Sequence, residues 1–139
     1  MPGKDRYACF SVPEYKNWTV TQYGTVVGID NIKKAISGQG PVSCGIELTP
    51  EFEAYTGGVF QQETSSGVRN HYVSLVGWGV DGSGLQYWIG RNSFGTAWGE
   101  FGFFKILIGR NNLGIENYCT YGIPKLNNNR DGTQVKIEI

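Results

Sequence analysis

The sequence predicts an α+β fold that is rich in β-strands and contains only short helices, within a single domain. Most apolar residues lie in short runs typical of strands, and only one segment shows a clear helical period. The 21 glycines among 139 residues are typical of a chain with many turns. Apolar residues make up 40% of the chain, which excludes a disordered protein and suits a modest core.

The first predicted helix follows a polar and aromatic lead-in, residues 1–28, that has little periodicity. It spans residues 29–37, because its isoleucines share one face and Asp30 can cap its start. A strand is predicted over 42–48, and the glycine- and proline-rich segment before it ends the helix.

A brief helical turn is predicted next, with Thr49 as its N-cap and Pro50 at its first position. Glu51 and Glu53 lie two residues apart in this turn and therefore do not face each other. We expect them to be solvated rather than to form an acid/base pair.

Two strand-like runs, one over 70–80 and one that begins at Leu85, flank Asp81-Gly82-Ser83-Gly84, and this arrangement predicts a β-hairpin. If Asp81 and Gly82 form the turn, His71 lies opposite Asn92. If Gly82 and Ser83, or all four residues, form it, Asn92 faces Val73 instead. In both cases His71 and Asn92 project from the same face, and directly opposed Cβ atoms lie roughly 5 Å apart. A three-residue loop or a β-bulge would break this parity.

The rest of the chain is predicted to be mostly extended. The expected elements are a strand over 101–108, a loop over 111–116, a polar turn over 127–132 and a final strand over 134–139.

His71, the only histidine, suggests a chemistry if the amide of Asn92 holds it. A histidine oriented by an amide oxygen is the base and its positioning group in thiol hydrolases. A structural histidine, hydrogen-bonded near a strand end, is the alternative, and the pairing alone leaves it open.

Composition argues against several other classes of function. The formal net charge is zero and no basic stripe exists, so a nucleic-acid partner is not expected. The sequence contains no run of 18 consecutive apolar residues, so no membrane span is predicted. Residues 1–6 lack the apolar core of a signal peptide. One histidine and dispersed cysteines predict no metal site, and no cofactor is expected. Residues 77–82 fit G-x-G-x-x-G, but a strand rather than a helix is predicted after them, which argues against a dinucleotide site.

The three cysteines, Cys9, Cys44 and Cys119, leave at least one without a partner in the chain. A bridge between Cys44 and Cys119 would stabilise the fold by about 4 kcal/mol in the chain-entropy model. Three free thiols are the alternative.

Several blocks resemble papain-like cysteine peptidases over roughly residues 7–124. The blocks are Asn70-His71, Gly77-Trp78-Gly79, Tyr87-Trp88-Ile89, Asn92-Ser93-Phe94-Gly95-Thr96-Ala97-Trp98-Gly99-Glu100, and segments 40–46, 55–60 and 119–124. The chain departs from the family at Phe94, where the family has a tryptophan. The family's early Cys-Gly-Ser-Cys-Trp block does not occur in the sequence.

The resemblance implies a papain-like fold, of which residues 1–139 form the carboxy-terminal lobe with a barrel-like antiparallel sheet. Residues 125–139 have no counterpart and are a possible extension. The resemblance also implies a disulfide between Cys44 and Cys119 and an upstream partner for Cys9.

The resemblance further implies that His71 and Asn92 are catalytic and that Phe94 and Trp98 form the wall of the site. The nucleophilic cysteine is then expected in a helical lobe outside residues 1–139, so the chain alone is expected to be inactive. Cys44 is a much weaker candidate for this role. An isolated lobe would expose an apolar face, and we expect it to self-associate.

The implied activity is that of a cysteine peptidase acting on peptides or proteins, and the blocks are most similar to a cathepsin with carboxypeptidase activity. The implied location is lysosomal or secreted, and Asn17-Trp18-Thr19 is a possible N-glycosylation site. The alternative is a truncated or degenerate relative that binds peptides or proteins without catalysis. The absent nucleophile and Phe94 favour this alternative, whereas His71 and Asn92 favour the peptidase.

Overall fold

The computed structural model describes residues 15–64 and 66–127. The elements are β1 (Asn17–Val26), α1 (Ile29–Gln39), β2 (Val42–Ile46), α2 (Pro50–Glu53), β3 (Val59–Phe60), β4 (His71–Val80), β5 (Gln86–Arg91), β6 (Phe103–Leu107), the 3-10 turn η1 (Asn112–Gly114) and β7 (Cys119–Asn127). Cys9, most of the predicted polar turn and the predicted final strand lie outside the described residues.

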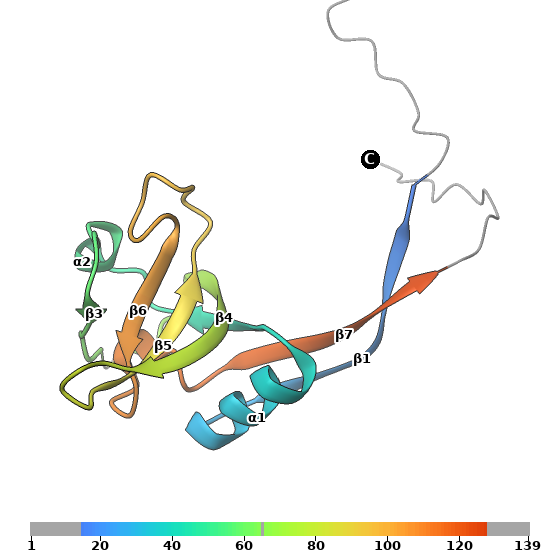
Figure 1. Cartoon of the computed structure of the whole chain (residues 1–139), viewed down its shortest axis with the longest axis horizontal. Coiled ribbons are helices and arrows are strands. Elements are labelled where there is room, and N and C mark those ends of the chain that lie inside the picture. Colours follow the sequence, from blue (N-terminus) through green and yellow to red (C-terminus); the bar gives the residue numbers. More distant parts are fainter. Residues whose placement is uncertain (1–14, 65, 128–139) are drawn as a thin grey trace, which may run out of the picture.

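The strands form one seven-stranded sheet in the described part of the chain, in the order β1-β7-β2-β4-β5-β6-β3. All the pairs are antiparallel except β3 with β6, and the sheet is not closed into a barrel. β1 and β7 extend away from the body as a two-stranded ribbon, while α1 lies beside β4 and β7 (Figure 1). The predicted α+β class, with few and short helices, is confirmed.

The core lies between one face of the sheet and the segments that cover it. Its largest fully buried side chains are Trp88, Phe52 and Phe104. Close packing explains one glycine, because a Cβ at Gly90 would overlap the ring of Phe104. Ile32 brings α1 onto this core.

The helices follow the predicted pattern with one difference. Thr49 caps α2 as expected, since its hydroxyl accepts a hydrogen bond from the backbone N–H of Phe52 at 3.2 Å. Asp30 does not cap α1, because the helix begins at Ile29, two residues earlier than a cap at Asp30 would allow, and its N-cap is Gly28 with a φ of 83°. Asp30 instead lies in the first helical turn, where its negative charge interacts favourably with the helix dipole.

The hairpin between β4 and β5 has a different turn from the predicted one. Its loop contains five residues, 81–85, because Val80 pairs with Gln86. The carboxylate of Asp81 organises this loop by accepting hydrogen bonds from the backbone N–H groups of Ser83 and Leu85, both at 2.9 Å.

A β-bulge restores the parity that the five-residue loop breaks. The register shifts between Leu75 and Gly77, after which Ser74 pairs with Arg91. Continued by one residue, this register sets Asn92 against Val73, as in the second predicted alternative. The predicted shared face of His71 and Asn92 therefore results from two irregularities that cancel.

The disulfide between Cys44 and Cys119 is present, as expected. It joins directly paired residues of β2 and β7 and closes a loop with a sequence separation of 75. Both sulfurs lie in the core. The bridge therefore attaches the base of the ribbon to the body of the lobe.

Candidate active site

His71 and Asn92 meet through their side chains, as the hairpin predicted. His71 is the first residue of β4, and Asn92 follows the last residue of β5. Nε2 of His71 lies 2.8 Å from Oδ1 of Asn92, and the backbone N–H of Ser93 donates to the same oxygen at 2.8 Å. Because an amide oxygen only accepts hydrogen bonds, Nε2 carries the proton and Nδ1 is left for other chemistry.

Asn92 is held from both sides. Its backbone N–H donates to the carbonyl oxygen of Gly102 at 2.9 Å, and its side chain is buried. The amide nitrogen Nδ2 is also buried, and it has no hydrogen-bond partner among the described residues. A buried N–H without an acceptor costs free energy, and here that cost falls on the residue that binds the imidazole.

Aromatic rings cover the imidazole on one side. The ring of Phe94 lies 5.1 Å from that of His71 and 5.6 Å from that of Trp98, the latter in an edge-to-face arrangement. Trp98 is fixed by its indole N–H, which donates to the carbonyl oxygen of Glu53 at 2.8 Å. Phe94 remains 41% exposed, so one side of its ring faces solvent.

A hollow of about 290 Å³ adjoins Asn92. Ser43, Ser74 and Arg91 contribute to its lining from directly paired positions on β2, β4 and β5. These positions lie on the sheet face opposite the core, because Cys44 and Val73 beside them are buried. Two serine hydroxyls and one cationic side chain therefore lie among the lining residues of the hollow, beside Tyr72 and Val73.

The described cysteines cannot act as thiolates. Cys44 and Cys119 are joined in the disulfide, so the weak alternative of Cys44 as a nucleophile is wrong. Within residues 15–64 and 66–127, no group of three or more His, Cys, Asp or Glu side chains is placed to hold a metal ion. No helix in the same residues is long and apolar enough to cross a membrane.

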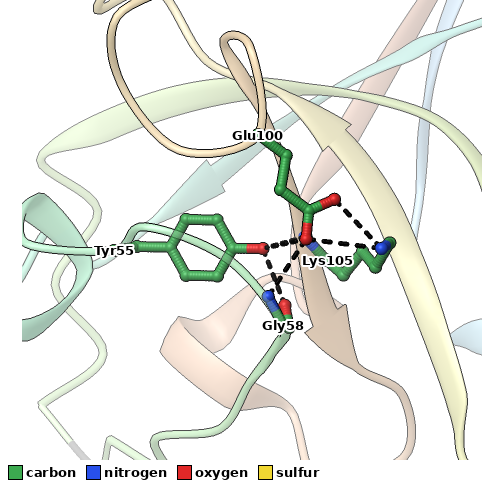
Figure 2. Close-up of polar contacts among 4 residues, drawn as sticks. All are labelled: Tyr55, Gly58, Glu100 and Lys105. Carbon is green, nitrogen blue, oxygen red and sulfur yellow. Dashed lines mark hydrogen bonds and ion pairs between the residues drawn. The ribbon is translucent and has the colours of Figure 1, made fainter.

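A cluster of four residues beside the site was not predicted from the sequence (Figure 2). The hydroxyl of Tyr55 donates to the carbonyl oxygen of Gly58 at 2.6 Å and accepts from the backbone N–H of Lys105 at 3.2 Å. The carboxylate of Glu100 accepts from the N–H of Gly58 at 3.0 Å and pairs with the Lys105 ammonium at 3.0 Å. Only the position of Glu100 next to the Trp98-Gly99 pair could have drawn attention to it.

Burial and hydrogen bonding act in opposite directions on this cluster. Burial alone would raise the pKa of Glu100, but the hydrogen bonds from Lys105 and Gly58 outweigh it and lower that pKa. The hydrogen bond to Glu100 raises the pKa of Lys105, and burial raises that of Tyr55. All three groups are therefore held in the charge states that bind one another.

The sequence is similar to known cysteine proteases over most of its length. Residues 2–123 match the model of the papain family cysteine proteases. A cathepsin Z of Onchocerca volvulus is 42% identical over 125 residues, which cover 84% of this chain and 40% of that protein. A cathepsin B-like cysteine proteinase 6 of Caenorhabditis elegans is 40% identical over 114 residues, or 82% of this chain and 30% of that protein.

Solved structures show the same relationship. The digestive procathepsin L 3 of Tenebrio molitor larval midgut superposes with a TM-score of 0.70 at 35% identity, over 76% of this chain and 36% of that chain. The bromelain protease of Ananas comosus superposes with a TM-score of 0.68 at 29% identity. The chain thus spans half or less of the length of these relatives: 36% and 50% of the two solved chains, and between 30% and 40% of the curated proteins.

Proposed function

The chain belongs to the papain family of cysteine proteases, and we propose that it supplies the histidine and asparagine of a cathepsin Z-like peptidase active site. In this proposal residues 1–139 form the carboxy-terminal β-rich lobe of that enzyme. The nucleophilic cysteine belongs to a helical lobe outside these residues. The disulfide supports this assignment, because it occupies both described cysteines.

The observation that carries the proposal is the hydrogen bond between His71 and Asn92. With Nε2 bound to the amide oxygen, Nδ1 is the atom that can face an incoming thiol. There it would take the thiol proton and form the ion pair that keeps the sulfur nucleophilic. The same nitrogen would protonate the leaving amine and then activate the water that releases the acyl group.

Asn92 is the orienting residue in this mechanism, and Phe94 and Trp98 form the wall of the site. The side-chain amide oxygen of Asn92 selects the imidazole tautomer that carries its proton on Nε2. Phe94 limits access of water to the hydrogen bond, although less completely than a larger indole would. Within this proposal, Phe94 lowers the efficiency of the site but does not alter its chemistry.

The finer assignment follows the similarity to cathepsin Z. We propose peptide or protein substrates, a carboxypeptidase preference and a lysosomal or secreted location. N-glycosylation at Asn17 is compatible with this location, because this side chain is exposed at the start of β1. The upstream partner of Cys9 is also part of this proposal.

A non-catalytic peptide- or protein-binding module is the second candidate. Phe94 favours it, because a ring 41% exposed is available for contacts with a bound chain. The two candidates differ in whether His71 is required for covalent chemistry.

The test combines this chain with a helical lobe that carries a Cys-Gly-Ser-Cys-Trp block, followed by labelling with a thiol-directed peptidase probe. We expect labelling of the helical lobe that is lost with His71→Ala and reduced with Asn92→Ala. Asn117→Ala, at an exposed asparagine, is the matched control and should leave labelling unchanged. A well-folded complex that is not labelled would contradict the peptidase assignment and favour the binding module.

A further inference from the structure

The unpredicted cluster is connected to the imidazole by a path of hydrogen bonds and the short covalent segments between them. Glu100 and Phe103 exchange backbone hydrogen bonds at 2.9 and 3.1 Å and so close a two-residue turn. Gly102, inside that turn, accepts the backbone N–H of Asn92 at 2.9 Å. The side chain of Asn92 then binds His71 at 2.8 Å. The position of the turn therefore determines the position of the orienting amide.

The cluster also reaches the aromatic wall. The ring of Tyr55 lies 5.5 Å from that of Trp98, and Trp98 contacts Phe94, which covers His71. The backbone N–H of Gly102 donates to the carbonyl oxygen of Trp98 at 2.7 Å, so wall and turn move together. The first path begins at Glu100 itself, and the second begins at Tyr55, whose hydroxyl lies 3.3 Å from a carboxylate oxygen of Glu100.

We propose that Glu100 is a positioning residue, whose carboxylate fixes the turn 100–103 and thereby aligns Asn92 with His71. Figure 2 shows the carboxylate between Gly58 on one side and Lys105 on the other. It thus joins the segment after α2 to the loop that leads into β6. Among the described residues, no other side-chain hydrogen bond joins the turn 100–103 directly to Gly58.

The strength of the arrangement comes from its combination of contacts. The Glu100–Lys105 ion pair is about one third exposed, with side-chain exposures of 31% and 35%, and such a pair alone contributes little. The hydrogen bond from the backbone N–H of Gly58 adds a charge-assisted contact, and the buried Tyr55 ring backs it. A local opening of the turn, rather than global unfolding, is the event that Glu100 opposes.

The single histidine makes this proposal directly measurable in the 139-residue chain. Nuclear magnetic resonance of ¹⁵N-histidine-labelled protein reports the solvent exchange of the Nε2 proton of His71 without signals from other imidazoles. We expect Glu100→Ala to accelerate this exchange about tenfold. Glu100→Gln should have a smaller effect, because its amide oxygen still accepts from Gly58.

Two further variants separate positioning from general stability. Tyr55→Phe removes the hydroxyl that bridges Gly58 and Lys105 and should also accelerate exchange. Glu63→Gln breaks the exposed ion pair of Glu63 with Arg110 at 3.1 Å, and it should change the exchange rate by less than about twofold. Urea denaturation of each variant identifies any acceleration that reflects global unfolding only.

The proposal is overturned if Glu100→Ala and Tyr55→Phe both leave the exchange rate within twofold of the parent, or if Glu63→Gln accelerates it equally. Its catalytic meaning rests on the proposed function, but the exchange measurement requires no peptidase activity. In the complex with a helical lobe, Glu100→Gln should lower kcat more than it changes KM. Faster exchange in the Glu100 variants together with a catalytically silent complex would refute the proposed function and leave the positioning role intact.

Discussion

Glu100 illustrates how one charged side chain can connect stability with the geometry of the site. Its carboxylate is more acidic in the folded chain than its ordinary value of 4.5, because hydrogen bonds from Lys105 and Gly58 outweigh the effect of burial. The unfolded chain then binds a proton at this group more tightly than the folded chain does. The stabilisation is therefore present above the ordinary pKa and is lost as the pH falls through the lowered, folded value.

We expect Glu100→Gln to lower the free energy of unfolding at neutral pH by up to about 1 kcal/mol, and we expect this difference to shrink below pH 4.5. Urea denaturation of parent and variant across this range measures it. Asp81, whose pKa is lowered by the Ser83 hydroxyl, contributes equally to the pH dependence of parent and variant, so its contribution cancels in the difference. In a Lys105→Gln background the effect should be smaller, and a difference that grows in acid would contradict the prediction.

Phe101 is a residue whose backbone conformation is unfavourable for its side chain. It occupies the two-residue turn with a φ of 55°, followed by Gly102 at 90°, and its ring is 84% exposed. Two successive positive φ values are typical of a type I′ turn, in which asparagine followed by glycine is preferred. The phenyl ring gains little burial in return for this strained conformation.

We therefore expect Phe101→Asn to raise the free energy of unfolding by about 0.5–1 kcal/mol, measured by urea denaturation. Tyr23→Asn is the control, because this side chain is 83% exposed but lies in strand β1. Replacing an aromatic residue by asparagine in a strand should be neutral or destabilising. Equal stabilisation by both variants would show that exposure, rather than the turn, is responsible.

At the scale of the elements, local patterns predicted more than long-range contacts did. The spacing of the isoleucines predicted α1, with an end two residues before the observed one, and Thr49 and Pro50 predicted α2. Both predictions succeeded because the signals lie within a few neighbouring residues. Strand β1 was missed, since its side chains are nearly all exposed and show no alternation. Its conformation depends on pairing with β7, which lies about a hundred residues away.

The candidate site shows the same division. The strands and turn around Asp81 predicted that His71 and Asn92 share a face, although the loop length was wrong and the bulge was not foreseen. The contacts of Glu100 with Gly58 and Lys105 could not be predicted, because no periodic pattern encodes which loop lies beside which. The disulfide followed from the family resemblance and not from the spacing of the cysteines.

The bulge at Val76 leads to a prediction for the hairpin. Deleting Val76 would make the Leu75–Gly90 and Gly77–Ile89 pairs consecutive without changing either, so Val73 and Leu75, now 4% and 0% exposed, should stay in the core. Deleting Ser74 instead would shift Val73 by one position and turn it out of the core. Exposing Val73 costs about 1.5–3 kcal/mol, so we expect only this second deletion to weaken cooperative thermal unfolding, followed by circular dichroism. Equal destabilisation by both deletions would contradict the assignment of Val76 as the extra residue of the bulge.

At the scale of the whole molecule, one face of the sheet is left uncovered. A second irregularity, between Val20 and Gln22 of β1, places Trp18, Val20 and Tyr23 on the same face of the ribbon. This face continues through the Thr120–Ser43 pair to the hollow lined by Ser74 and Arg91. The three ribbon side chains are 59%, 57% and 83% exposed, and apolar surface of this kind is typical of an interface.

We expect the 139-residue chain to self-associate through this face when no partner lobe is present, because association removes the ribbon side chains from water. Sedimentation velocity over a range of concentrations should show species larger than the 15.3 kDa monomer. The double variant Trp18→Ser and Val20→Thr should weaken association, because it reduces the apolar surface while threonine keeps the strand propensity. Val68→Thr changes a 50% exposed valine outside the ribbon and should leave association unchanged. Addition of the helical lobe should also dissociate the oligomer if both use the same face. A monomer at every concentration would show that the uncovered face does not drive association by itself.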